Sequence, residues 1–238
     1  MTTIRLHVPR KDDCIHELQR LLPGESADIH VFPEGFLSTD ALSDALQIIR
    51  DAGAFVIAGY KDTSSGAPLQ RALVIDRGTI IGESTKCVLT STEKRKGTLP
   101  GNEIRCVDTP FGKIGIPICY EIHFPEVSRC LALEQPVLLV NIIGTGMYHD
   151  LQFSPWTALA RARAIENEVH IVGCCHNTEG IPLAFAYRSN GEILLEEKYA
   201  HDSYTVSLDL SESAQRPIGY FRNRTPDKFQ KICTAEEL

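Results

Sequence analysis

The sequence predicts an α/β fold with a mixed sheet, and three patterns lead to that prediction. At the start of the chain, short runs rich in Ile and Val alternate with longer helical patterns. In the middle, pairs of extended runs flank a tight turn, which is the pattern of antiparallel hairpins. Helical and extended patterns then alternate again. Because such alternation is typical of strands covered by helices, hairpins joined to it require a sheet with both strand directions.

The first part of the chain predicts three strands with two helices between them. In chain order these segments are TIRLHV, DDCIHELQRLL, ADIHVFPE, TDALSDALQIIRDAG and AFVIAGY. The strand segments are short and apolar, whereas the longer ones carry apolar residues at helical spacing. Pro33 and Gly35 flank Glu34 and are expected to take the chain out of the second strand at that point.

Two antiparallel hairpins are expected in the middle of the chain. RALVIDRGTIIGESTK turns around the Asp-Arg-Gly of residues 76–78, and IRCVDTPFGKIGIPICYE turns around the Pro-Phe-Gly of residues 110–112. Gly and Pro are the residues that such turns favour. A short helix from Pro125 to Glu134 and a buried strand, PVLLVNIIG, are expected to follow.

A long helix is expected from SPWTALARARAIENE. Ser154 suits the N-cap and Pro155 the first helical position. Apolar residues at helical spacing predict a core-facing stripe, formed by Leu159, Ala162, Ile165 and Val169. The last segments predict strands: HIVGCCHN, a hairpin in LAFAYRSNGEILLEEK around an Asn-Gly turn, and YTVSLDL.

Composition narrows the class of ligand. The 238 residues carry a net charge of -7, and the only short basic cluster is EKRK at 93–96. This argues against nucleic acid or an anionic membrane as partner and favours a small neutral or polar molecule. No segment approaches the ~20 apolar residues of a membrane span, and the start has too few for a signal peptide. We therefore expect a cytoplasmic protein with one domain over residues 1–238, since no long linker interrupts it.

Eight cysteines show no C-x-x-C pair and no spacing typical of a disulfide scaffold, so reduced thiols are expected. Cys174, Cys175 and His176 are adjacent, but neighbouring strand residues point to opposite faces. At most two of them could meet on one side, which is too few for a metal site. We therefore expect packed thiols here and no metal.

Three polar residues at expected strand ends are candidates for catalysis, because ligands of open α/β sheets bind beyond the carboxyl ends of the strands. Glu34, Lys86 and Cys119 each have an ordinary explanation alone: a solvated acid, a surface amine and a buried thiol. Together they supply a base, a cation and a nucleophile for acyl transfer. There is no G-x-C-x-G or G-x-S-x-G elbow, and His123 lies only four residues after the thiol. A Cys-His-Asp site is therefore not supported.

The residues around these three positions resemble the nitrilase superfamily of carbon-nitrogen hydrolases. The matching segments are FPEGFLS, the K-C-V-L at Lys86, LPG at 99–101, DTPFGKIGIPICYEIHFPE and RARAIEN at 161–167. They occur in the family's order and extend over most of the chain, from about residue 4 to about 210. The set is specific, although each fragment alone is weak.

The resemblance implies a four-layer α-β-β-α sandwich and a triad of Glu34, Lys86 and Cys119 that cleaves amides, nitriles or carbamoyl groups without metal or organic cofactor. Glu93 matches the family's additional active-site glutamate. In the implied mechanism, Lys86 and the backbone N–H of Tyr120 hold the oxyanion. CYE looks more like amidases than true nitrilases, so a small amide that yields acid and ammonia through a Cys thioester is the expected substrate.

The chain also departs from the family pattern near the expected pocket. The segments before and after Glu34 are short, and Ser84 and Val88 replace an aromatic and a His that often flank the Lys. His123 stands where many members, including carbamoyl-amino-acid hydrolases, have Arg, so a carboxylate clamp is not expected there. The segment NIIGTGM matches a region that often lines the pocket, and a Gly-rich strand exit explains it equally well. The candidates for contact with substrate are thus His123, Asn141, Gly144 and Met147.

Other functions use the same residues. An acyl or amide transferase, a nitrile or carbamoyl hydrolase, and a catalytically idle binding module are the alternatives, the last disfavoured by an intact triad. The family usually forms dimers, so a homodimer or higher homo-oligomer is expected. Residues 218–238 form a polar tail that is the candidate segment for this association.

Overall fold

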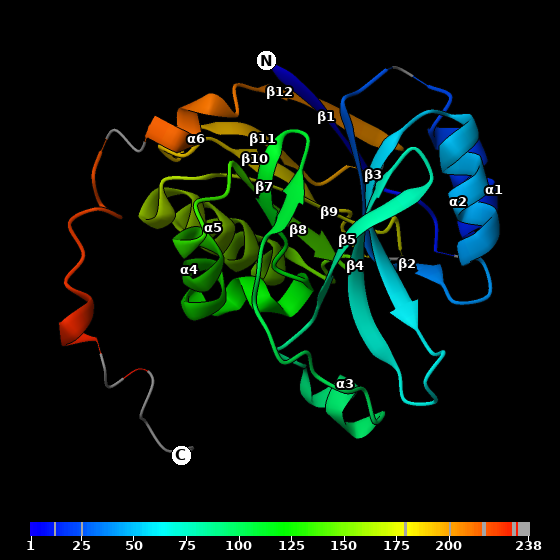
Figure 1. Ribbon diagram of the computed structural model, residues 1–238, viewed down its shortest axis with the longest axis horizontal. Coiled ribbons are helices and arrows are strands. Elements are labelled where there is room, and N and C mark those ends of the chain that lie inside the picture. The colour runs from blue at the N-terminus through cyan, green and yellow to red at the C-terminus, as the bar shows by residue number, and fades with distance from the viewer. Residues whose placement is uncertain are drawn as a thin grey trace.

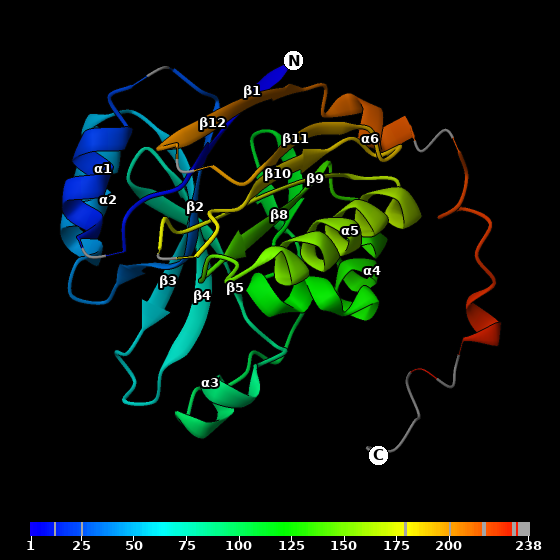
Figure 2. The ribbon, with the colours of Figure 1, turned by 180° about the vertical axis from the view of Figure 1, so that it is seen from behind.

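Two six-stranded sheets face each other in the computed structural model, and helices cover the outside of both (Figure 1). The structure describes residues 1–238 except 12, 25, 179, 200, 216–217, 230–231 and 233–238. Helices α1 (Cys14–Leu21) and α2 (Leu42–Asp51) lie outside the first sheet, and α4 (Pro125–Leu133) and α5 (Asp150–Asn167) outside the second. The turned view in Figure 2 shows the same four layers. The expected α/β class and four-layer sandwich are confirmed.

The first sheet has the strand order β12-β1-β2-β3-β4-β5. Its strands are β1 (Thr2–His7), β2 (Ile29–Ser38), β3 (Phe55–Asp62), β4 (Leu69–Asp76), β5 (Thr79–Thr85) and β12 (Ser203–Leu208). The β1-β2 and β2-β3 pairs are parallel, and the remaining pairs are antiparallel. The sheet is therefore mixed, as the combination of alternating segments and hairpins predicts.

The second sheet has the order β11-β10-β9-β8-β7-β6 and is mixed in the same way. Its strands are β6 (Val107–Thr109), β7 (Gly112–Gly115), β8 (Leu138–Ile143), β9 (His170–Cys175), β10 (Ala184–Tyr187) and β11 (Ile193–Glu197). Strands β7, β8 and β9 run parallel. The shorter elements are α3 (Ser91–Arg95), α6 (Ser211–Gln215) and the 3-10 helices η1 (Cys119–His123) and η2 (Pro226–Lys228).

The central strands are apolar throughout because both of their faces are buried. Along β2, Ile29 and Val31 belong to the core that includes the space between the sheets, whereas Phe32 belongs to the core under α1 and α2. This arrangement leaves the strand ends as the places where polar side chains can gather.

Strand β2 does not end at Glu34, contrary to the expectation from its Pro and Gly neighbours. Its pairing with β3 shifts between Phe32 and Leu37, and the strand then continues to Ser38. Residues 33–36 form a bulge that the neighbouring strand accommodates at Gly59, where an added methyl would lie 2.3 Å from the Cα of Glu34. A bulge re-aims a side chain without ending the strand, and here it sets the direction of the Glu34 carboxylate.

Helix α5 begins at Asp150, so the expected start at Ser154 and Pro155 is wrong. The N–H groups of Gln152 and Phe153 both donate to the carbonyl of His149, which closes a turn ahead of the proline. Its buried face is also displaced from the expected stripe, and comprises Phe153, Trp156, Thr157, Ala160, Arg163, Ala164 and Asn167. The added first turn shows that local cap preferences were overridden by backbone bonds upstream.

Among the described residues, no helix has the length and apolar character needed to cross a membrane. The C-terminal segment leaves the sandwich on the side of α4 and α5 (Figures 1 and 2). Part of the expected tail at 218–238 lies outside the described residues, namely 230–231 and 233–238.

Candidate active site

Glu34, Lys86 and Glu93 form one buried charge cluster. The Lys86 ammonium donates to Glu34 Oε1 at 2.8 Å and to Glu93 Oε1 at 2.7 Å. Lys86 is only 1% exposed, so its charge is screened from water and compensated by these two carboxylates. Burial acts to lower the pKa of Lys86, but its interactions with Cys119 and Glu34 raise it on balance, so the side chain stays cationic.

Glu93 is held by its own helix as well as by Lys86. Thr90 caps α3, and its backbone N–H and hydroxyl both donate to Glu93 Oε2, at 2.7 and 2.8 Å. Burial acts to raise the pKa of Glu93, yet the hydrogen bond and charge of Lys86 lower it on balance. The T-x-x-E spacing of a capping box was a readable signal for α3.

Cys119 begins η1, directly after the segment that continues β7. Its φ of 51° lies in the left-handed region, which costs a non-glycine residue roughly 1–3 kcal/mol and recurs at functional sites. The residue as a whole is 7% exposed. Burial and the Glu34 carboxylate raise the pKa of Cys119, whereas Lys86 and the Gly144 N–H lower it. The net effect is a neutral thiol beside a carboxylate that can take its proton.

Gly144 brings this carboxylate into place. An added methyl at Gly144 would lie 2.3 Å from Glu34 Oε2, the oxygen that Lys86 does not hold. Asn141 supports the Cys119 turn from β8, since its amide donates to the carbonyls of Pro117 and Cys119 at 2.8 and 3.3 Å. Both residues were sequence candidates for contact with substrate, and the structure places both against the triad.

The other two pocket candidates, His123 and Met147, contact other parts of the fold. His123 Nδ1 lies 3.0 Å from the carbonyl of Tyr120, and its ring packs edge-on against Trp156. Met147 is fully buried and pairs with Ile181 through the backbone. Contact of either residue with substrate stays a prediction.

The N–H of Tyr120 has no hydrogen-bond acceptor within the part of the chain that the structure describes. This group was expected to hold an oxyanion together with Lys86. A backbone donor at the start of a short helix, next to the thiol, suits that task because it is preorganised.

Two positioning residues were missed by sequence reasoning. Glu121 is buried and its carboxylate accepts from the N–H groups of Ile118, Cys87 and Val88, at 2.8, 2.7 and 3.1 Å. It therefore joins the segment after Lys86 to the turn of Cys119. His176 Nε2 donates to the carbonyl of Glu34 at 3.0 Å, and burial lowers the pKa of this His to about 4, which keeps it neutral. Their partners are backbone groups of distant segments, so only the acid after C-Y was a sequence signal.

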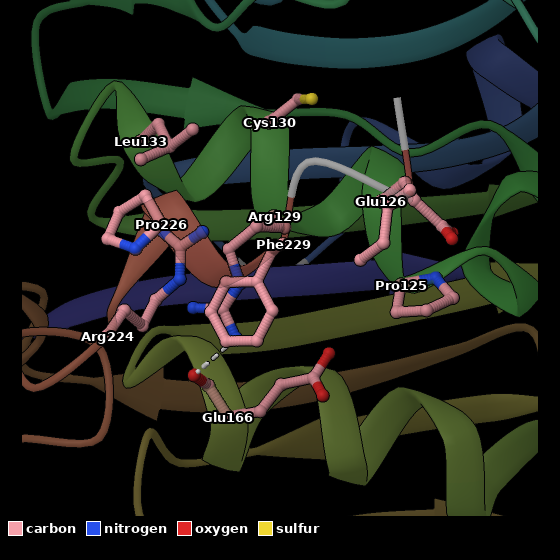
Figure 3. Close-up of a pocket in the computed structure, with 10 residues that line it drawn as sticks. Pro125, Glu126, Arg129, Cys130, Leu133, Glu166, Arg224, Pro226 and Phe229 are labelled. Atoms are coloured by element: carbon pink, nitrogen blue, oxygen red, sulfur yellow. Dashed lines mark hydrogen bonds between the residues drawn. The ribbon is translucent and has the colours of Figure 1, made fainter. Parts of the chain in front are cut away.

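Two surface cavities lie away from the triad. One, of about 500 Å³, borders β5 and the loop 100–105. The other, of about 630 Å³, lies between α4 and the C-terminal segment (Figure 3). These cavities are not lined by Glu34, Lys86 or Cys119. The candidate site is therefore identified by the charge cluster and not by cavity volume.

The family model for carbon-nitrogen hydrolases matches residues 15–211. The chain belongs to the carbon-nitrogen hydrolase family. The resemblance found in the sequence motifs is therefore confirmed. Similar curated proteins include a probable nitrilase of Schizosaccharomyces pombe, 30% identical over 68% of this chain and 61% of that protein. An omega-amidase of Xenopus laevis is 30% identical over 84% of this chain and 76% of its own length.

An omega-amidase of Saccharomyces cerevisiae is 34% identical over 56% of this chain. The matched segment spans 48% of that protein and 61% of the S. pombe protein. The match therefore covers about half to two thirds of the length of these two relatives. Their full-length activities do not transfer with the family.

Solved structures share the fold over nearly the whole chain. A carbon-nitrogen hydrolase from Helicobacter pylori superposes with a TM-score of 0.87 at 15% identity, covering 99% of both chains. An amidase variant from Nesterenkonia sp. AN1, with acrylamide added to its active-site cysteine, gives 0.81 at 18% identity, covering 98% of this chain and all of that one. At these identities the likeness establishes the fold alone.

Proposed function

We propose that the chain hydrolyses a small amide to an acid and ammonia through a Cys119 thioester. The observation that carries this proposal is the Lys86 ammonium, which is buried and bonded to both Glu34 and Glu93 beside the Cys119 thiol. A nucleophile, a base and a fixed cation are the parts that acyl transfer requires. Omega-amidases among the relatives favour an amide over a nitrile.

In the proposed mechanism, Glu34 takes the thiol proton as the Cys119 sulfur forms a bond to the substrate carbonyl carbon. Lys86 and the Tyr120 N–H stabilise the oxyanion, typically by ~3 to 4 kcal/mol per donor. The C–N bond then breaks, and the leaving nitrogen takes the proton from Glu34. Water next attacks the thioester, giving a proton to Glu34, and the returning thiol recovers it as the acid leaves.

His123 favours substrates without a carboxylate at this position. Burial lowers the pKa of His123, so the ring is neutral at physiological pH and supplies no charge to bind an anion. This supports a small uncharged amide over a carbamoyl amino acid.

The test compares ammonia release from a panel of small amides by the wild type and by Cys119→Ala. We expect a loss of at least about a thousandfold, because the nucleophile is removed. Cys130→Ala, which removes the exposed thiol of α4, is the matched control and should keep full activity. Undiminished release by Cys119→Ala would contradict the proposal. The mass of an acyl adduct trapped on Cys119 would identify the acyl group, and acrylamide is a suitable probe of the same thiol.

We also propose that the protein is a cytoplasmic homo-oligomer that associates through the outer face of α4 and the C-terminal segment. Leu133, Phe229 and Ile232 border the larger cavity and are exposed (Figure 3). Exposed apolar side chains that gather in one place are typical of protein interfaces. Light scattering of the purified chain tests this: a monomer at micromolar concentration would contradict it, whereas a dimer that dissociates in Leu133→Lys would support it.

A further inference from the structure

Gln70 lies next to Lys86 of the candidate active site, and its side-chain oxygen has no partner among the described residues. It precedes Arg71 on β4, where Arg71 pairs with Thr85 of β5, and its carbonyl accepts from the Lys86 N–H at 2.9 Å. Residues opposite each other on antiparallel strands direct their side chains to the same face. Gln70 therefore shares a face with Lys86, whose ammonium binds Glu34.

The side-chain oxygen of Gln70 is enclosed, and it has no hydrogen-bond partner among the residues that the structure describes. Leaving a buried acceptor unpaired destabilises the fold. The residue as a whole is only half-buried, so the Gln70 side chain could rotate to direct its oxygen towards water instead. An unpaired oxygen kept inside indicates that a donor from outside the described chain completes it.

The enclosed oxygen lies beside a small space at Gly35, the residue that follows Glu34. A methyl group built on Gly35 would have Gln70 Oε1 at 3.9 Å and, apart from its chain neighbours, no other described atom within 4 Å. Gly35 has a φ of +66° and belongs to the bulge that directs the Glu34 carboxylate. The space beside the catalytic base is therefore lined by a neutral acceptor.

The Glu34 carboxylate, the acceptor that lies beside this space, is already engaged. Glu34 Oε1 is taken by Lys86, and Glu34 Oε2 lies against Gly144, with the carboxylate close enough to the Cys119 thiol to raise its pKa. A primary amide carries two N–H donors, and both need acceptors when the site excludes water. Gln70 Oε1 can accept one of them, whereas an oxygen ester of the same acid has no N–H to offer.

We propose that Gln70 is a substrate-binding residue whose Oε1 accepts a hydrogen bond from the N–H of the scissile amide, and that it gives the site its preference for primary amides. The inference rests on the proposed amide hydrolysis. It assigns to Gln70 recognition of the leaving nitrogen, and leaves the nucleophile, base and oxyanion donors as described.

The experiment compares kcat/KM for a primary amide and for the methyl ester of the same acid, in the wild type, Gln70→Leu and the control Gln47→Leu on the surface of α2. We expect Gln70→Leu to lose about 10- to 100-fold on the amide, in proportion to one buried hydrogen bond, and less than about threefold on the ester. Gln47→Leu should change neither. Thermal stability of Gln70→Leu should be equal or higher, since an unpaired buried oxygen is removed.

Each outcome separates the two proposals. Equal losses on amide and ester, or no loss on the amide, would overturn the role of Gln70 and leave the hydrolase intact. A wild type that hydrolyses no amide in the panel would overturn the proposed function and with it this assignment. If Gln70→Leu fails to fold, Gln70→Asn withdraws the oxygen by one methylene, and the same amide-selective loss is expected.

Discussion

Gly144 shows how a single missing side chain can determine the geometry of the candidate site. Its position leaves room for Glu34 Oε2, the carboxylate oxygen that Lys86 does not hold. General base catalysis depends on this oxygen being within reach of the proton it removes. The absence of a Cβ at Gly144 is thus a requirement of the charge cluster.

We expect Gly144→Ala to lower kcat for amide hydrolysis by about 100-fold or more. The added methyl would lie 2.3 Å from Glu34 Oε2 and would displace the base from its reacting position. The melting temperature should change less than the rate, because the strand ends stay paired. Ammonia release and thermal melting check this together. Gly24→Ala is the control, since the three atoms nearest to its methyl belong to the flexible end of the Arg5 side chain. Full activity in Gly144→Ala would show that Glu34 Oε2 is not the reacting oxygen.

The sequence predicts the three candidate catalytic residues but does not predict the residues that hold them in position. Glu34, Lys86 and Cys119 could be found because each follows an apolar run in the sequence, and polar residues at expected strand ends are candidates for a site. Glu121 and His176 bind backbone groups of segments far away in the chain, and no local pattern reports such a contact. Only the folded structure shows these two contacts.

Glu121 joins the segments that carry Lys86 and Cys119, which different sheets supply. One oxygen accepts from Cys87 and Val88 after β5, and the other accepts from Ile118 before η1. Burial raises the pKa of Glu121, although these three N–H groups act to lower it. The carboxylate therefore fixes the spacing between Lys86 and Cys119.

We expect Glu121→Gln to lower the free energy of unfolding by roughly 1–3 kcal/mol, because one N–H would face an amide NH₂ in place of an acceptor. At a temperature where the variant remains folded, the rate of ammonia release should still fall, because the segments that carry Lys86 and Cys119 would separate. Urea unfolding and ammonia release measure the two effects. Glu126→Gln, an exposed acid of α4, should change neither, and an unaltered Glu121→Gln would contradict the bridging role.

Element boundaries differ from the sequence expectation where backbone pairing overrides local signals. Pro33 and Gly35 mark a bulge inside β2, because β3 offers Gly59 at the point of closest approach. Pro155 lies within α5, because bonds to the His149 carbonyl start the helix earlier. Order and type of the elements follow from periodicity, whereas these details depend on a partner strand or turn that the local sequence does not reveal.

At the scale of the whole molecule, buried histidines link stability to pH. His7 and His30 lie on adjacent strands, with His7 Nε2 3.0 Å from His30 Nδ1, and their rings stack. Burial, with a smaller contribution from the charge of Arg5, lowers the pKa of His30 to about 4, and burial also lowers the pKa of His7. The unfolded chain would bind protons at these sites near pH 6.5, whereas the folded chain stays neutral.

The sign of the pH dependence follows from these shifts. Stability from a His with a lowered folded pKa is complete above pH 6.5 and is lost as pH falls towards 4, by about 1.4 kcal/mol per pH unit and per group. For His30 alone this amounts to roughly 3 kcal/mol between pH 6.5 and 4. We expect His30→Gln to remove that share, so that its unfolding free energy falls less on acidification than that of the wild type. Urea midpoints at pH 7.5 and 5 measure the difference. The control is His16→Gln, because the His16 side chain is 68% exposed. Its unfolding free energy should fall on acidification as much as that of the wild type. If the unfolding free energy of His30→Gln falls by the same amount, other groups cause the acid sensitivity.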